Sequence, residues 1–400
     1  MENLRSLFIL SFLALLFSGC NHDSDYIDPR GTDYAGAESC IQCHQSAYHS
    51  ALQNAHHKAT APASIENVMG SFMSHNTFAY DQNTKLVMEK RGDSLYQVLY
   101  ENGKAVKAYR FDIVFGIKNA QTSVYWHNKN TYELPVSYYK SADAWATSPG
   151  FSATAPNFDR RVNKDCYECH SSNASNRIVT TNSAANSSSV FMDMDDAIDS
   201  KTIVYGIDCE RCHGPAKKHV DYHLRFPDVK TAHDIASFKS LSNQQKLDAC
   251  AICHSGNDHR LKIKPRFPFR PGDKLSDYYR NPLSGTTDYD VHGNQNGLLA
   301  QSKCFMESGT MNCTTCHNSH ENKVSNLAAY SKVCISCHNN MSHAAPTIKT
   351  ISENALKQNC IDCHMPKQSS KAIGFQLSND AKLSSYQLRT HKIAIYPAKK

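Results

Sequence analysis

Seven copies of the pattern Cys-x-x-Cys-His run through the 400-residue chain. This spacing suits covalent attachment of haem c, because two thiols can form thioethers to the haem vinyl groups while the adjacent histidine binds the iron. The seven units are Cys40/Cys43/His44, Cys166/Cys169/His170, Cys209/Cys212/His213, Cys250/Cys253/His254, Cys313/Cys316/His317, Cys334/Cys337/His338 and Cys360/Cys363/His364. The sequence therefore predicts seven covalently bound haem c groups, with the motif histidines as iron ligands.

Two other uses of paired cysteines compete with haem. A disulfide framework explains an even number of cysteines but gives no reason for a histidine after every second one. Zinc ribbons also contain Cys-x-x-Cys pairs, yet these pairs seldom repeat with an attached histidine. Haem is therefore the favoured reading, and of the 16 cysteines only Cys20 and Cys304 remain. We interpret Cys304 as a buried, unreactive thiol rather than a ligand.

The N-terminus has the pattern of an export signal. A charged start is followed by an apolar run over residues 7–17, which is too short to span a membrane, and by Ser18-Gly19-Cys20. Residues 16–20 resemble a bacterial lipoprotein box, with Phe17 where leucine is more usual, and so predict a lipid on Cys20. An ordinary signal peptide with an incidental cysteine is the alternative. We expect an extracytoplasmic protein on the periplasmic or cell-surface side, as an outer-membrane lipoprotein anchored to the membrane.

Between the first and second motifs lies a long segment without cysteine. Alternating apolar residues predict β-strands at Lys85–Glu89, Leu95–Tyr100 and Ala108–Phe115, and the Arg91-Gly92-Asp93 and Asn102-Gly103 sequences are typical of the turns between them. The fold expected is a mostly α-helical and irregular, haem-packed cytochrome with a small antiparallel β-sheet inserted near residues 78–140.

The expected organisation follows from these features. We predict a signal peptide at 1–19, a lipid-anchored tether at 20–35, a first haem segment at 36–76, a β-sheet insertion at 77–150 and a six-haem array at 151–400, with a flexible loop at 171–200.

Composition and charge agree with haem as the filler of the core. Only 40% of residues are apolar, which is lean for so long a chain, and large apolar porphyrins would make up the difference. The formal charge of +6 is more than offset by the propionates of seven haems. The basic sequence is thus no argument for binding nucleic acid, which we do not expect.

The activity depends on the second axial ligand of each iron. Haem with two histidines is closed and suits electron transfer, whereas an open position can bind a small molecule. Seven of the 21 histidines belong to the motifs. Chain reach limits the others: His320 follows His317 by only three residues and cannot reach the opposite face of the same haem. His343 after His338, and His219 after His213, are limited in the same way, which predicts ligands exchanged between haems.

The motif surroundings resemble a known family. Asp33–His44 with Tyr48, Cys209–Pro215, the Cys316-His317-Asn318-Ser319-His320 turn and the Cys363-His364-Met365-Pro366 ending look like the multihaem cytochromes grouped with the nitrifiers' tetrahaem cytochrome and with hydroxylamine oxidoreductase. The resemblance spans most of residues 33–395. It implies seven distal ligands, with His56 as an alternative to the first of them: His57, His75, His219, His292, His320, His343 and His391. It leaves six histidines without a ligand role, among which His259 is the alternative that could replace one of the seven: His22, His49, His127, His223, His233 and His259.

Two functions remain in competition. The first is electron transfer through closely packed haems with two histidines each, between a quinol-linked or periplasmic donor and a terminal oxidoreductase or extracellular acceptor. The second is a multihaem oxidoreductase that acts on a small nitrogen or sulfur oxyanion at one five-coordinate haem. No motif has lysine in place of its histidine, as the pentahaem nitrite reductases do at their active haem, and this favours the electron carrier.

Overall fold

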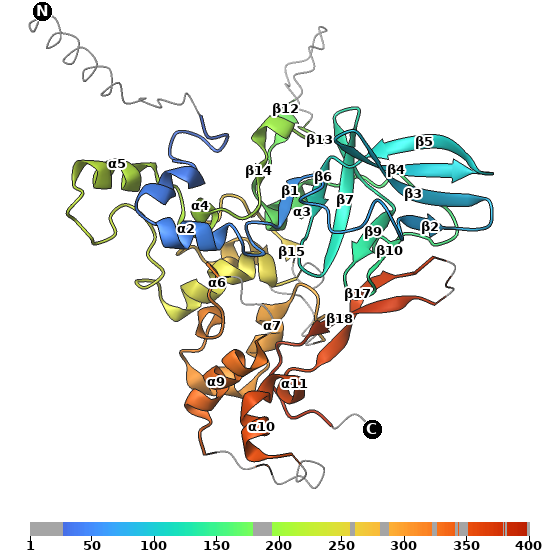
Figure 1. Cartoon of the computed structure of the whole chain (residues 1–400). Helices are drawn as coiled ribbons and strands as arrows, with labels where there is room; N and C mark the ends of the chain where they lie inside the picture. Colours follow the sequence, from blue (N-terminus) through green and yellow to red (C-terminus); the bar gives the residue numbers. More distant parts are fainter. Residues whose placement is uncertain are drawn as a thin grey trace, which may run out of the picture.

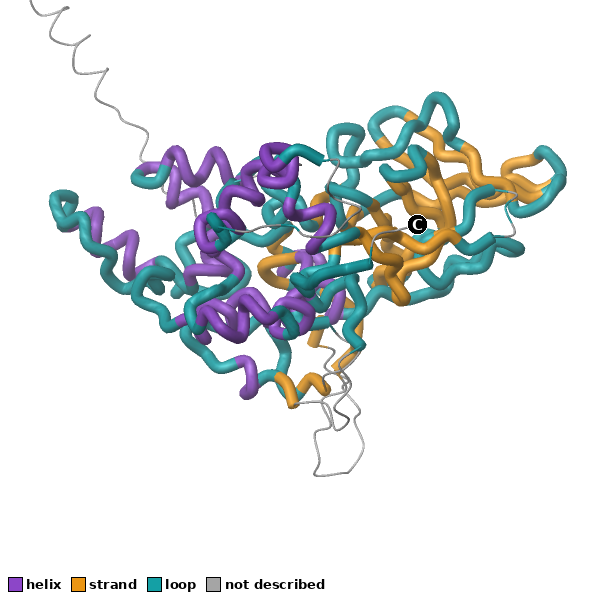
Figure 2. Tube along the Cα trace, turned by 90° about the horizontal axis from the view of Figure 1, so that it is seen from below, coloured by secondary structure: helices purple, strands orange, loops and turns teal. Residues whose placement is uncertain are grey.

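The computed structural model describes residues 27–178, 194–256, 261–280, 288–321, 326–340, 343, 351–378, 380 and 382–397. The predicted signal peptide, Cys20 and residues 179–193 of the predicted loop lie outside these ranges. Helices gather on one side of the molecule and strands on the other (Figures 1 and 2). We call these two parts the helical lobe and the β lobe.

Most of the β lobe lies between the first and second motifs. One sheet has the strand order β1-β6-β7-β9-β10, with β8 paired to β7, and a four-stranded sheet has the order β2-β3-β4-β5. The strands are β1 Thr60–Pro62, β2 Thr77–Ala79, β3 Thr84–Arg91, β4 Ser94–Glu101, β5 Lys104–Arg110, β6 Ile113–Phe115, β7 Ala120–His127, β8 Asn130–Glu133, β9 Val136–Tyr139 and β10 Ala144–Thr147.

The strands predicted at Lys85–Glu89 and Leu95–Tyr100 and both turns are present, but the single strand predicted at Ala108–Phe115 is wrong, because the chain leaves one sheet after Arg110 and enters the other at Ile113. Asn102 and Gly103 both have positive φ, at 50° and 76°, which is the geometry of the tight hairpin turn expected for this pair. Buried side chains from both sheets, such as Leu86 and Met88 on β3 and Val136 on β9, form a shared apolar core. The region is therefore a pair of packed sheets with its own core, larger than the small single sheet expected from the sequence.

A C-terminal hairpin also joins the β lobe. Strands β17 (Lys367–Phe375) and β18 (Ser384–Arg389) pair with each other and lie beside β9 and β10 in Figure 1. Phe375 stacks on Tyr139 with ring centroids 4.1 Å apart, and the Thr147 amide donates to the Gln376 carbonyl at 3.0 Å. The segment just after the seventh motif is thereby tied to the sheet that follows the first motif.

The helical lobe consists of short elements. Its helices are η2 Ala37–Gln42, α2 Gln45–Ala51, α3 Lys164–His170, η3 Ser200–Thr202, α4 Cys209–His213, α5 Lys217–Arg225, α6 Asn243–His254, η4 Leu275–Asp277, α7 Gln295–Ala300, α8 Lys303–Ser308, η5 Cys313–Thr315, α9 Leu327–Cys337, α10 Glu353–Gln358 and α11 Cys360–His364. Its small strand pairs are β11 Ser171–Asn173 with β14 Val204–Tyr205, β12 Asn176–Ile178 with β13 Met194–Ile198, and β15 Leu261–Lys262 with β16 Tyr279–Arg280.

Local capping explains where the motif helices begin. The Asn163 side chain accepts from the Asp165 amide before α3, and Asp208 accepts from the Arg211 amide before α4. Ser242 and Gln245 form a reciprocal capping box at the start of α6. Within the described residues, no helix is long and apolar enough to cross a membrane.

A buried ionic cluster fixes the N-terminal segment to the third motif. Arg30 lies 2.8 Å from Asp28, 2.8 Å from Asp208 and 2.9 Å from Glu210, and all four side chains are at most 5% exposed. Glu210 also accepts hydrogen bonds from three backbone amides, those of Ala35, Gly36 and Ala216. Glu210 occupies one of the two positions between the cysteines of the third motif, which we call spacer residues. A spacer residue therefore fixes the third motif to the N-terminal segment.

The second motif is held in the same way. Its spacer residue Glu168 is 1% exposed and lies 3.0 Å from the Arg266 guanidinium and 3.2 Å from the Lys262 ammonium. Arg211, from the spacer of the third motif, donates to the Arg266 carbonyl at 3.0 Å. Buried charges therefore connect the second and third motifs through the segment that contains Arg266.

The Glu210 cluster generates a stability prediction. Replacing Glu210 with Ala removes the acceptor of three amides and one of the three carboxylates around Arg30, and breaking a buried ion pair costs about 3–5 kcal/mol. We expect a matching fall in the free energy of unfolding of the haem-loaded protein in denaturant. The control is Asp221→Ala, which removes only an exposed pair with Lys217 and should cost about 0.5 kcal/mol or less. Equal losses in the two variants would contradict the role given to Glu210.

Candidate functional site

The seven motifs lie on short helical segments. The second, third, fourth and seventh are at or near the ends of α3, α4, α6 and α11, the sixth ends α9, and the first and fifth begin in η2 and η5. On a helix, side chains three and four residues apart share one face. The two cysteines and the histidine of a motif that lies on a helix are therefore presented together on one side of the segment.

The first motif departs from this helical arrangement at Cys43. The 3₁₀ helix η2 ends at Gln42, so Cys43 is its C-cap residue, and the Cys43 amide donates to the Cys40 carbonyl at 3.4 Å. Its side chain is exposed, whereas that of Cys40 is half-buried. This exposure follows from the place of Cys43 beyond the helix end, and its attachment to a haem stays a prediction.

Exposure varies among the other attachment cysteines as well. Cys166, Cys337 and Cys363 are exposed like Cys43, Cys360 is buried, and the remaining ones are half-buried. A thioether needs only to reach a vinyl group at the edge of the porphyrin, so an exposed thiol is compatible with attachment.

Five motif histidines face the ring of a second histidine. The ring centroids are 6.3 Å apart for His44 and His219, 5.9 Å for His213 and His320, 6.1 Å for His254 and His56, 6.2 Å for His317 and His391, and 6.4 Å for His364 and His343. In four of the pairs at least one other motif lies between the two residues in the sequence, and in the fifth, His343 lies between the sixth motif and the seventh, which contains His364.

These separations fit a metal between the rings. An imidazole nitrogen binds a transition metal at about 2.0 Å, and it lies about 1.1 Å from the centre of its own ring. Two imidazoles on opposite sides of one iron therefore have ring centroids about 6.3 Å apart. All five pairs fall close to this value. The donor set thus suits a haem iron bound by two histidines.

The remaining two motif histidines differ from these five. His170 has an electrostatic contact with His292, which places those two residues near each other. His338 has no histidine ring against it in the described part of the chain. Only two histidines, His22 and His259, lie outside the described residues.

The distal histidines named from the sequence occupy three kinds of position. His219, His320, His343 and His391 face motif histidines, and His292 neighbours His170. His57 does not face a motif histidine among the described residues, whereas the adjacent His56 does. His75 is exposed, with φ of 52°. His320, His343 and His219 each face a histidine of a motif other than the one that precedes them.

Carbonyl groups orient several of these rings. Nδ1 of His213 lies 3.2 Å from the Ala236 carbonyl, Nδ1 of His219 lies 2.8 Å from the His233 carbonyl, and Nδ1 of His364 lies 2.9 Å from the Ala394 carbonyl. A proton on Nδ1 that is held in this way leaves Nε2 as the metal-binding nitrogen. Desolvation lowers the pKa of His391 to about 4, so its ring is neutral at pH 7, the form that binds iron.

Thiols of different motifs also meet. Side chains are hydrogen-bonded between Cys40 and Cys209, between Cys169 and Cys253, and between Cys250 and Cys313. None of the described cysteines forms a disulfide. The fourth motif, which contains Cys250 and Cys253, therefore touches both the second and the fifth.

Weaker electrostatic contacts extend this series. Cys212 interacts with Cys253, and Cys334 interacts with both Cys316 and Cys360. Every motif thus neighbours at least one other, so the attachment residues form one continuous array. Cys304 is half-buried rather than buried, and it lies near Cys316 and Cys334 within this array.

Comparisons with known proteins give two similarities. No family model matches the chain. The multiheme cytochrome MtrA of Shewanella baltica (strain OS185) is 22% identical over 249 residues, which are 59% of this chain and 65% of that protein. The chain therefore spans about 65% of the length of this curated relative.

The second similarity is structural. The crystal structure of the outer cell wall cytochrome OcwA superposes with a TM-score of 0.51 at 14% identity, covering 90% of this chain and 80% of that one. At this identity the match concerns the fold, and it extends through both lobes. Neither similarity singles out the nitrifier or hydroxylamine oxidoreductase class. Together, the sequence and structural similarities support a multihaem c-type cytochrome with covalently bound haem.

Proposed function

We propose that this chain is an exported heptahaem c-type cytochrome that transfers electrons between redox proteins. Haem c would supply the one-electron carriers, attached through the fourteen motif cysteines and held by the seven motif histidines. The first haem would belong to residues 36–76 and the other six to residues 151–400, on either side of the β lobe. The observation that carries the proposal is the set of histidine pairs at 5.9–6.4 Å.

Six haems would be closed by two histidines each. The pairs, with the motif histidine first, are His44 and His219, His170 and His292, His213 and His320, His254 and His56, His317 and His391, and His364 and His343. His56 takes the role that the resemblance implied for either it or His57, and His75 takes none. Five of the distal histidines that the resemblance to the tetrahaem cytochrome and hydroxylamine oxidoreductase class implies, His219, His292, His320, His343 and His391, belong to these pairs, and we infer on that basis that the chain is related to this class.

The contacts between thiols suggest which haems would be neighbours. They connect the first motif to the third, the third to the fourth, the fourth to the second and the fifth, and then the fifth, sixth and seventh in turn. Transfer over short distances requires such a continuous series. The fourth motif is the branch point of three arms, one through the third motif to the first, one through the second motif towards the β lobe, and one through the fifth motif towards α9 to α11.

The compartment and partners are also part of the proposal. Cysteine-linked haem and the N-terminal signal pattern suit an extracytoplasmic protein anchored through a lipid on Cys20. The structurally similar OcwA is an outer cell wall cytochrome, which is consistent with a surface location. A quinol-linked or periplasmic donor and a terminal oxidoreductase or extracellular acceptor would then be its redox partners.

A second candidate is an oxidoreductase for a small nitrogen or sulfur oxyanion. One observation favours it: His338 lacks a histidine opposite its ring in the described part of the chain. The six histidine pairs favour electron transfer as the principal function.

Haem loading gives the first test. Mass spectrometry of the proteolysed, purified protein should find one haem on each of the seven motif peptides, and reductive titration should take up seven electrons per chain. A motif peptide with two unmodified thiols after expression with a full cytochrome maturation system would contradict the heptahaem assignment. The four peptides that contain an exposed cysteine, Cys43, Cys166, Cys337 or Cys363, are the most informative ones.

The choice between two adjacent histidines gives a sharper test. His56→Ala should remove a ligand from the haem on His254 and add a high-spin ferric signal that amounts to one haem per chain in electron paramagnetic resonance. His57→Ala is the matched control, because its ring has no contact with a motif histidine among the described residues, and it should leave the spectrum of the parent protein unchanged. The reverse pattern would reject the pairing of His56 with His254.

A further inference from the structure

The sixth motif differs from the other six in what faces its histidine. His338 follows the end of α9, and its ring has no histidine against it in the described residues. The histidine nearest to it along the chain, His343, is 6.4 Å from His364, so it already belongs to the seventh motif. His343 is thereby assigned to the seventh motif, in agreement with its short reach from His338 along the chain.

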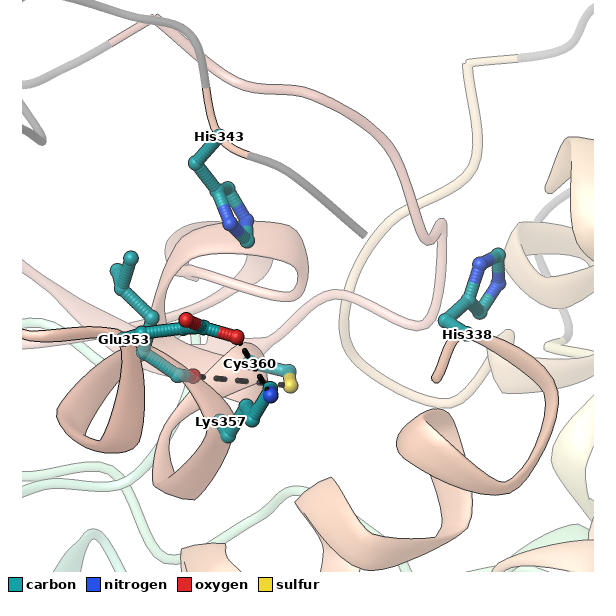
Figure 3. Close-up of a pocket in the computed structure, with 6 residues that line it drawn as sticks. His338, His343, Glu353, Lys357 and Cys360 are labelled. Atoms are coloured by element: carbon teal, nitrogen blue, oxygen red, sulfur yellow. Dashed lines mark hydrogen bonds and ion pairs between the residues drawn. The ribbon is translucent and has the colours of Figure 1, made fainter. Parts of the chain in front are cut away.

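A pocket lies at this position. Its lining residues come from the sixth motif, from α10 and from the start of α11: His338, His343, Glu353, Leu356, Lys357 and Cys360. Figure 3 shows His338 and His343 on different sides of the pocket, with Glu353, Lys357 and Cys360 along a third side. The Cys360 amide donates to the buried Ser331 hydroxyl of α9 at 3.0 Å, which holds α11 against the sixth motif.

The lining residues offer no other strong iron ligand that is available. Cys360 is an attachment residue of the seventh motif. Lys357 forms an ion pair with Glu353 at 2.6 Å, one turn apart on α10, and its side chain is 43% exposed. An ammonium group in an ion pair has no lone pair to give to a metal. Leu356 has no donor atom.

We propose that the haem held by Cys334, Cys337 and His338 keeps an exchangeable sixth position, and that it binds small ligands with a donor atom, such as carbon monoxide, cyanide or a small inorganic anion. This inference rests on the proposed haem attachment, and it deepens the electron-transfer function by giving one of seven haems a binding role. Glu353 and Lys357 lie at the edge of the same pocket and are paired with each other.

The test uses the full-length, haem-loaded protein. Fully reduced protein titrated with carbon monoxide should bind one molecule per seven haems, and the oxidised protein should show a high-spin ferric signal that integrates to about one haem in seven. Seven low-spin haems and no carbon monoxide binding would overturn the proposal, whatever residue closes the site. No variant is needed for this result, so it does not depend on a mutant that folds.

Two variants locate the site. The double variant Cys334→Ala/Cys337→Ala should lose one covalent haem and, with it, the bound carbon monoxide and the high-spin signal. His343→Ala should instead open the seventh haem and raise the ratio to two molecules of carbon monoxide per chain. Carbon monoxide binding that persists in full after loss of the sixth haem would place the open position elsewhere and reject the proposal.

A third variant excludes lysine as the ligand. Lys357→Ala should leave the ratio at one molecule of carbon monoxide per chain. A parent protein that binds none, together with a Lys357→Ala protein that binds one, would identify Lys357 as the sixth ligand and overturn the open position. The two proposals fail in different ways. If the heptahaem assignment is wrong, the mass spectrum shows missing haems. If only the open position at the sixth haem is wrong, all seven haems are present and all are low-spin.

Discussion

A histidine next to its own haem attachment site can reach only one face of that haem. The opposite face must be served from another part of the chain, and this constraint organises the molecule. His320 faces His213 although it follows the fifth motif, and His56 faces His254 across almost 200 residues. Each such pair brings two distant segments together, so the pairs, as the proposed haem ligands, would perform the long-range organisation that an aliphatic core performs in most proteins of this length.

Other interactions hold the segments at the required spacing. The spacer residues Glu168 and Glu210, inside two of the motifs, are at most 2% exposed and pair with Arg266 and Arg30. Charges buried in this way seldom add much net stability, but removing one partner is costly, so they fix the relative position of the motifs. The β lobe adds a second restraint, since the hairpin β17–β18 ties the seventh motif to strands β9 and β10. The segment that carries His391 begins directly after this hairpin.

Much of the site could be predicted from the sequence, because the chemistry of haem attachment is local. Two thiols and a histidine within five residues define it, and a reach of a few residues is enough to show that His320 and His343 do not serve their own motifs. The partners themselves are not local properties. His56 and His57 are equivalent in sequence terms, and only the packing of the first haem segment against α6 places the former opposite His254. His75 lies on the exposed side of a turn that the sequence does not distinguish from an inward one.

The fold shows the same division between local and distant information. The strands of residues 84–110 could be predicted from the alternation of apolar residues and from the Asn-Gly turn. The hairpin near the C-terminus and the second sheet could not be predicted, because both depend on contacts made by distant residues.

The central claim is that six irons lie between specific histidine pairs and that one does not. A crystal or cryo-electron microscopy structure of the haem-loaded protein tests it most directly, by showing which side chains flank each iron. The account predicts imidazole nitrogens on both sides of six irons, in the pairs given above. The remaining iron, at the sixth motif, should have His338 as its one histidine ligand. Histidine on both sides of the iron at His338, or His57 in place of His56 at the fourth motif, would contradict it.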